Sequence, residues 1–176
     1  MISRSFAKTV LLVLICGLLA ACQTTGLKPG SVETRFPVDG WIKAQKGNST
    51  IYACVKCKTP QIILTGPSKV TGDVESAIRA DVLSTGLLSE IDKTVTKLSS
   101  GAIRSLSRRK ITTKNYSGFE FVYRIQEPGK KPIYLAGRSI VQNDKGMQIS
   151  SYAASANVAK ANLRKYLANT TIRRLP

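Results

Sequence analysis

The chain has 176 residues, of which 27 are Lys or Arg and 10 are Asp or Glu, and its formal net charge is +17. It contains no histidine, which excludes Ser-His-Asp and Cys-His catalysis and the commonest side-chain ligand of transition metals. A charge of this size predicts acidic partners and says nothing about the fold.

The N-terminus has the parts of an export signal. Arg4 and Lys8 precede an apolar run at 10–21, and small residues end the run just before Cys22. The run is too short for a transmembrane helix, which needs about 20 residues. The stretch Leu19-Ala20-Ala21-Cys22 resembles the lipobox of bacterial lipoproteins. That resemblance implies cleavage before Cys22 and acylation of its thiol and of the new N-terminus.

The resemblance also implies a location for the protein. Acyl chains would anchor it to a membrane, and Gln23 takes the place of the Asp that often retains such proteins in the inner membrane. We therefore expect an outer-membrane lipoprotein that faces the periplasm. An uncleaved membrane anchor and a plain secreted protein are the alternatives.

Three segments follow from this interpretation: a signal peptide at 1–21, a flexible lipidated tether at 22–38, and a single domain at 39–176. The tether is predicted because Gly, Pro, Ser and Thr dominate it and no apolar period is present. After residue 21 the chain has 155 residues, with 25 basic and 10 acidic side chains, so its net charge is +15.

The first half of the domain is expected to hold three strands and a long helical region. Strands are predicted at 41–44, 49–57 and 61–65, the first two joined by a turn at 46–48. Asp73 is a good N-cap for a helix that extends to residue 98, and the stretch 84–86 predicts a kink or break within it. We expect the apolar stripe of this helix to pack against a sheet. Its members are Val74, Ala77, Ile78, Val82, Leu88, Ile91, Val95 and Leu98.

The second half predicts four more strands and a helix. The strands are expected at 110–116, 119–125, 133–142 and 147–151, with turns at 127–132 and 143–146. A final helix is predicted at 155–169, followed by a frayed tail that contains Arg173 and Arg174. Short turns between consecutive strands require antiparallel pairing. The predicted fold class is therefore α+β: an antiparallel sheet of about six or seven strands, covered by a long, kinked or broken central helix and a C-terminal helix.

The stretch from Tyr116 to Tyr123 reads Tyr-Ser-Gly-Phe-Glu-Phe-Val-Tyr, a turn glycine followed by an aromatic, alternating strand. Together with the order of elements, it resembles the PsbP-like fold group over about residues 40–170. The resemblance implies a protein that binds and stabilises protein complexes. It transfers no catalytic residue, and fold by itself does not determine function.

Cys54 and Cys57 form the motif Cys-Val-Lys-Cys, the one short motif with potential chemistry. An oxidising compartment favours a disulfide between them. A redox-active pair is the alternative, but such pairs usually begin a helix, and here the motif ends an apparent strand. A metal site would need two more ligands, which the mature chain does not offer as free Cys or His. No metal and no cofactor are therefore expected.

A basic surface is the second candidate site. Its predicted members are Arg104, Arg108, Arg109, Lys110, Lys114, Lys160, Arg164 and Lys165. Arg side chains can bind phosphate or carboxylate through two hydrogen bonds. Alternation along a strand would, however, divide the first five between two faces. Few aromatic residues lie between these charges, so nucleic acid is not an expected partner.

The expected function is that of a binding or assembly-support module for an acidic envelope protein or an anionic polymer such as lipopolysaccharide. The alternatives are a periplasmic thiol-disulfide protein that uses Cys54 and Cys57, and a surface-exposed lipoprotein that binds host molecules. No enzyme is expected. Glu90 and Asp92 form a close acidic pair, but residues two apart on a helix do not face each other.

Overall fold

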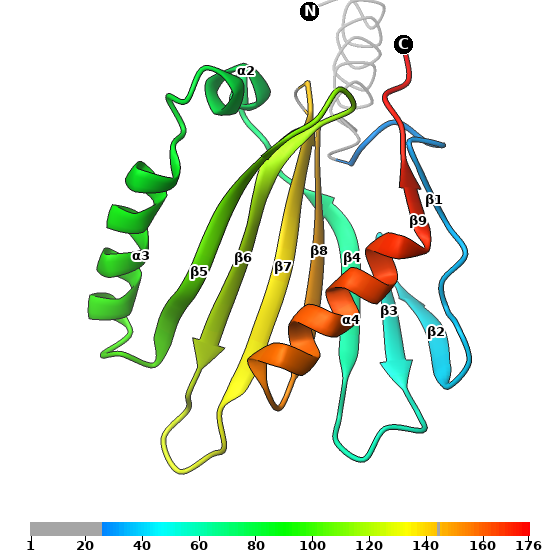
Figure 1. Ribbon diagram of the computed structural model, residues 1–176, viewed down its shortest axis with the longest axis vertical. Helices are drawn as coiled ribbons and strands as arrows, with labels where there is room; N and C mark the ends of the chain where they lie inside the picture. Colours follow the sequence, from blue (N-terminus) through cyan, green and yellow to red (C-terminus); the bar gives the residue numbers. More distant parts are fainter. Residues whose placement is uncertain (1–25, 144) are drawn as a thin grey trace, which may run out of the picture.

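The computed structural model describes residues 26–143 and 145–176, and it has the predicted α+β architecture. A seven-stranded antiparallel sheet has the order β2-β3-β4-β8-β7-β6-β5, and a two-stranded sheet pairs β1 with β9. Figure 1 shows the sheet with α4 across its front. The strands are β1 (Val32–Thr34), β2 (Trp41–Lys46), β3 (Ser49–Cys54), β4 (Ile62–Ser68), β5 (Ile103–Thr112), β6 (Ser117–Ile125), β7 (Ile133–Gln142), β8 (Lys145–Ala153) and β9 (Thr170–Ile172). The helices are α2 (Val74–Arg79), α3 (Thr85–Leu98) and α4 (Ala156–Ala168).

The predicted four-strand meander is present as β5 to β8, and β8 joins it to β4. The first of these strands begins earlier in the chain than the predicted range, 110–116. It starts at Ile103 and ends at Thr112, and the backbone N–H of Thr113 donates to the carbonyl of Tyr116 at 2.9 Å to form the turn. The basic residues obscured this strand because they interrupt its apolar alternation.

The main core lies between the sheet and α4. Alternate residues of the strands point to this face, among them Tyr52, Ile63 and Ile140, and they pack under Leu163 and Tyr166 of the helix. All five are at most 2% exposed. Burying a side chain of this size stabilises the fold by roughly 1.5–3 kcal/mol.

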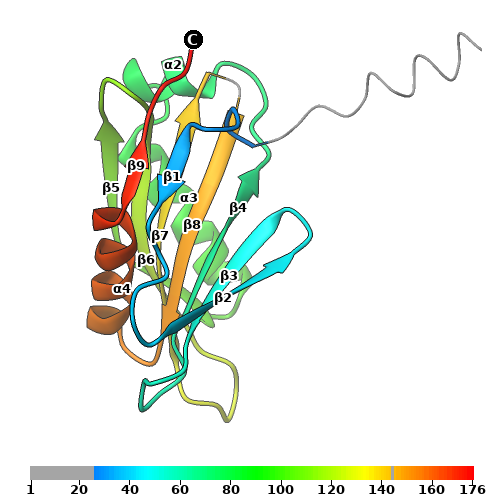
Figure 2. The ribbon, with the colours of Figure 1, turned by 90° about the vertical axis from the view of Figure 1, so that its right-hand side faces the viewer.

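The long helical region is broken, as the stretch 84–86 predicted. Ser84 is the N-cap of α3, where its hydroxyl accepts a hydrogen bond from the N–H of Leu87 at 3.1 Å. Val82 lies in the break and is 68% exposed. Figures 1 and 2 show α3 along the edge strand β5, on the side of the sheet opposite α4.

The prediction that the whole apolar stripe packs against the sheet is wrong for part of α3. Leu88 and Val95 are half-buried, but Ile91 is 49% exposed and Leu98 is 82% exposed. The physical reason is position. A helix beside an edge strand has the sheet on one side only. The sheet therefore covers about half of the apolar stripe of α3, whereas a helix over the centre of the sheet would have the whole stripe buried.

The predicted flexible tether is wrong for residues 26–38. Phe36 is 3% exposed, and its ring lies 5.3 Å from Trp41, 5.1 Å from Tyr52 and 5.4 Å from Tyr166, measured between ring centroids. Strand β1 pairs with β9. Burial of this aromatic ring outweighs the loss of freedom in a segment rich in Gly and Pro.

The predicted frayed tail is also wrong, since the backbone N–H of Arg173 donates to the carbonyl of Ser31 at 2.8 Å and so continues the pairing of β1 with β9. The predicted signal peptide, 1–21, and the predicted lipidation site, Cys22, lie outside the described residues. None of the helices within 26–143 and 145–176 is long and apolar enough to cross a membrane.

Candidate anion-binding cleft

A row of alternating charges crosses the sheet on the face that α4 covers. Strand register places Arg109 of β5 opposite Glu120 of β6, and Glu120 opposite Arg138 of β7. Arg109 Nη2 lies 3.1 Å from Glu120 Oε1, and Arg138 Nε donates to Glu120 Oε2 at 3.2 Å. Arg138 Nη1 also donates to the hydroxyl of Tyr116 at 3.0 Å. One carboxylate therefore holds two guanidinium groups in place.

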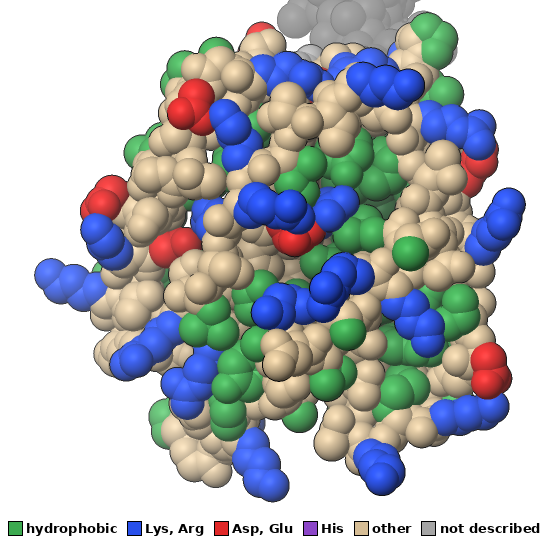
Figure 3. All heavy atoms as spheres, in the orientation of Figure 1, with side chains coloured by type: hydrophobic (Ala, Val, Ile, Leu, Met, Phe, Trp, Pro, Cys, Tyr) green, Lys and Arg blue, Asp and Glu red, His purple; other side chains and the backbone are tan. Residues whose placement is uncertain are grey.

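Helix α4 adds two more basic residues next to this row. Lys160 and Arg164 are one turn apart, and together with Arg109 and Glu120 they line a cleft of about 230 Å³ between α4 and the sheet. Leu163 contributes apolar lining. Neither Lys160 nor Arg164 has an acidic partner in the part of the chain that the structure describes. Figure 3 shows basic side chains distributed over this face, with few acidic ones among them.

The cleft is therefore electrostatically unbalanced. Burial by itself raises the pKa of Glu120, but hydrogen bonds and charge from Arg138 and Arg109 outweigh that effect and lower the pKa. Glu120 is thus ionised at neutral pH. It offsets one of the four positive charges that Arg109, Arg138, Lys160 and Arg164 bring together. The remaining charge suits a phosphate or carboxylate group.

Three of the eight predicted basic residues thus meet in the cleft: Arg109, Lys160 and Arg164. Their neighbour Arg108 points to the opposite face, because successive residues of a strand alternate. There it binds both carboxylate oxygens of Asp92, at 2.6 Å through Nη2 and 3.1 Å through Nε. It also lies 5.6 Å from the ring centroid of Tyr123. Arg108 fastens α3 to β5 and is not available to a partner.

The other four predicted residues are dispersed. Lys110 pairs with Asp81 in the segment between α2 and α3. Lys114 lies in the turn after β5 and lines a separate polar hollow with Arg79. Arg104 lines a groove between α3 and β5, and Lys165 is exposed on α4. The eight predicted basic residues thus do not form one continuous surface, and three of them line the cleft.

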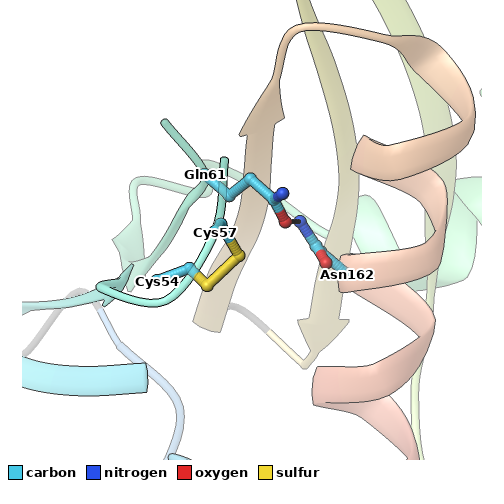
Figure 4. Close-up of a disulfide and its surroundings, with 4 residues drawn as sticks. All are labelled: Cys54, Cys57, Gln61 and Asn162. Atoms are coloured by element: carbon cyan, nitrogen blue, oxygen red, sulfur yellow. Dashed lines mark hydrogen bonds between the residues drawn. A yellow bond between two sulfur atoms is a disulfide. The ribbon is translucent and has the colours of Figure 1, made fainter. Parts of the chain in front are cut away.

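Cys54 and Cys57 form a disulfide that closes the end of β3. The N–H of Cys54 donates to the carbonyl of Gln61 at 3.0 Å. The side chain of Gln61 accepts a hydrogen bond from Asn162 Nδ2 of α4 at 2.8 Å, as Figure 4 shows. The bridge therefore shapes a loop that is fastened to the C-terminal helix. Neither cysteine begins a helix, which favours a structural bond over a redox-active one.

The sequence interpretation missed the residues that organise these charges. The sequence pattern places Glu120, Tyr116 and Arg138 in predicted strands and gives none of them a functional role. Hairpin register could have found the row, because two short turns place β5, β6 and β7 side by side. Glu90 and Asp92 bind different bases: Glu90 pairs with Lys93 at the surface, and Asp92 pairs with Arg108. Within the described ranges, no group of three or more Cys, Asp or Glu could hold a metal ion.

The sequence matches no protein-family model and no curated protein. Among solved structures, the fold is similar to that of cyanobacterial PsbP (CyanoP) from Synechocystis sp. PCC 6803, with a TM-score of 0.50 and 14% sequence identity. The match covers 84% of this chain and 89% of that one. This similarity confirms the predicted PsbP-like resemblance at the level of the fold, and at this identity it extends no further.

Proposed function

We propose that this protein is an outer-membrane lipoprotein that faces the periplasm and binds an acidic envelope partner through the cleft between α4 and the sheet. The partner is an acidic protein or an anionic polymer such as lipopolysaccharide. One observation carries the proposal: Arg109, Lys160 and Arg164 come from elements about 50 residues apart and line one cleft. The charge that Glu120 leaves unbalanced is the charge that an acidic group would neutralise.

The physical argument for binding concerns preorganisation. Glu120 holds the guanidinium groups of Arg109 and Arg138 before any partner arrives. Binding therefore costs less conformational entropy, because the Arg109 and Arg138 side chains are already ordered. Charge-assisted hydrogen bonds from such groups are stronger than neutral ones. Exposed charges are screened by salt, so the proposed binding weakens as ionic strength rises.

The anchor rests on the lipobox resemblance at Cys22 and on Gln23 after it. Mass spectrometry of the membrane-bound protein should find Cys22 as the first residue, carrying acyl groups, and density-gradient fractionation should find it in the outer membrane. A mature chain that starts at another residue contradicts the anchor. Protease treatment of intact cells separates a periplasm-facing protein, which is protected, from the surface-exposed alternative, which is digested.

The cleft is tested by removing two of its charges. The lipidated Lys160→Gln/Arg164→Gln variant and the unchanged protein are compared in pull-downs from envelope extract and on purified lipopolysaccharide. Each lost contact should cost about 1 kcal/mol, so retention at low salt should fall roughly tenfold or more. The matched control is Lys165→Gln/Lys131→Gln, which removes the same charge from exposed positions outside the cleft.

Equal loss in both variants would show that total charge, and not the cleft, governs retention. Binding that survives high salt in the cleft variant would point to an apolar interface instead. The thiol-disulfide alternative predicts reductase or isomerase activity that disappears in Cys54→Ser/Cys57→Ser. The position of this disulfide at a strand end supports the binding role over that alternative.

A further inference from the structure

One end of the molecule holds both the start of the described chain and its C-terminus, as Figure 1 shows. Gly26 lies against Pro67 near the end of β4, and Lys28 Nζ donates to the carbonyl oxygen of Pro176. Helix α2 and the turns that join β5 to β6 and β7 to β8 lie at this same end. We call it the N-terminal end.

The distance from this end to the proposed anchor is short. Three residues, 23–25, separate Cys22 from Gly26, and four steps along a fully extended chain reach about 14 Å. The residues from 26 onward pack into the fold, with Phe36 in the core, and so they add no reach. An acylated Cys22 would therefore hold the N-terminal end close to the lipid headgroups.

The N-terminal end is also positively charged. Lys28, Lys69 and Lys114 are exposed there. Lys69 and Lys114 have no acidic partner among residues 26–143 and 145–176, whereas Lys28 is hydrogen-bonded to an oxygen of Pro176. Asp73, which caps α2, offsets one of these charges.

The other ionic groups at this end add to the positive charge. Two bases, Arg79 and Arg174, converge on the buried carboxylate of Glu75, so that cluster carries a net positive charge. Arg173 is balanced by Glu33, at 3.0 Å. Among the described residues at this end, six basic side chains, Lys28, Lys69, Lys114, Arg79, Arg173 and Arg174, thus stand against three acidic ones, Glu33, Asp73 and Glu75.

We infer that the N-terminal end of the domain docks on anionic phospholipid headgroups, with Lys28, Lys69 and Lys114 as its contact residues. The inference rests on the proposed acylation of Cys22, which brings this end to the bilayer. Lysines beside an anionic membrane are attracted to it over about a Debye length, roughly 8 Å at physiological salt. Docking would give the domain one orientation, with the β3–β4 and β6–β7 turns away from the membrane.

The test uses the mature chain, 22–176, with Cys22→Ser, so that no acyl chain contributes to binding. Sedimentation with vesicles of phosphatidylethanolamine and phosphatidylglycerol is compared with sedimentation with phosphatidylcholine vesicles. Binding to the anionic vesicles alone is expected. Each lysine near such a surface changes the partition coefficient about fivefold, so Lys28→Gln/Lys69→Gln/Lys114→Gln should reduce binding by at least about tenfold.

A matched variant removes three positive charges from the opposite end. Lys58 lies in the β3–β4 turn, and Lys130 and Lys131 lie in the β6–β7 turn. Lys58→Gln/Lys130→Gln/Lys131→Gln should change vesicle binding by less than about threefold, because these positions are far from the surface. Equal losses in the two triple variants would overturn the inference, as would equal binding to anionic and neutral vesicles.

The cleft variant Lys160→Gln/Arg164→Gln separates this inference from the proposed function. It should keep vesicle binding while it loses retention on the envelope partner. If instead it loses vesicle binding and the N-terminal triple variant does not, the cleft binds the lipid and the docking inference fails. Inorganic phosphate at matched ionic strength should not release the protein from vesicles. Release by phosphate would identify a site for the free ion and refute surface docking.

Discussion

Removing the carboxylate of Asp92 should loosen the attachment of α3 to the sheet. Asp92 accepts two hydrogen bonds from Arg108 and one from the hydroxyl of Tyr123, at 2.7 Å. The side chains of Arg108 and Asp92 are 14% and 10% exposed. Asp92→Ala would leave a guanidinium group and a phenol hydroxyl without this acceptor in a mostly buried contact.

The expected cost follows from that burial. Breaking a buried ion pair on one side costs about 3–5 kcal/mol, and the residual exposure of Arg108 places this case near about 3 kcal/mol. For a domain of this size, that corresponds to a fall in Tm of roughly 6–12 °C. Urea unfolding and thermal unfolding, followed by circular dichroism, measure both quantities.

A matched control lies two positions earlier on the same helix. Glu90 pairs with Lys93, but those side chains are 67% and 70% exposed, and such a surface pair contributes about 0.5 kcal/mol or less. Glu90→Ala should therefore leave the unfolding midpoint nearly unchanged. If Asp92→Ala costs no more than Glu90→Ala, the buried pair does not fasten α3, and the reasoning from burial is wrong.

A double substitution tests the mechanism of the loss. Asp92→Leu/Arg108→Met removes both charges and fills the site with apolar side chains of similar size. Replacing a buried pair in this way is often neutral or stabilising, so the double variant should be more stable than Asp92→Ala. A double variant as unstable as the sum of its single variants would show that Asp92 and Arg108 act independently.

Three further predictions concern stability. Phe36→Ala should reduce the free energy of unfolding by about 3–5 kcal/mol, whereas a flexible tether at this position predicts no change; urea unfolding decides between them. Hydrogen bonds from Arg partners outweigh the effect of burial and lower the pKa of Glu75 and Asp92 below their usual values. The stability that these groups contribute is therefore present above about pH 4–5, and it should be lost as the pH falls through their lowered pKa values. Urea midpoints measured from pH 7 to pH 3 check this, and Asp92→Asn should flatten the loss. Cys54→Ser/Cys57→Ser should cost about 2 kcal/mol, the chain-entropy value for so short a loop, and a far larger loss by calorimetry would contradict that account.

Local patterns in the sequence were sufficient for most of the elements. The alternation from Phe119 to Ile125 predicted β6, and the short turn after Gln142 predicted the pairing of β7 with β8. The break before α3 could be predicted because Ser84 is a good N-cap and Gly86 is a poor helix former. Each of these features depends on neighbours within a few residues, which is the range over which sequence patterns carry structural information.

Elements whose partners are distant in the sequence could not be predicted in the same way. Strand β1 has three residues, and its partner β9 lies more than 130 positions away. No pattern in the sequence near Val32 or Phe36 predicts that pairing, so the Gly, Pro, Ser and Thr content of this segment indicated a tether. The exposure of Ile91 and Leu98 likewise depends on where α3 lies, beside an edge strand.

The charged residues show most clearly which properties the sequence determines and which depend on the tertiary structure. Composition determined that the protein is strongly basic and lacks histidine, and residue order determined that Cys54 and Cys57 are suitably spaced to form a disulfide. Only the tertiary structure decided that the adjacent residues Arg108 and Arg109 serve different purposes. Strand alternation turns one toward Asp92 and the other toward Glu120, and the packing of α4 brings Lys160 and Arg164 beside the second. A sequence records which charges exist, but their effect depends on distances that folding alone sets, because electrostatic interactions act through space and not along the chain.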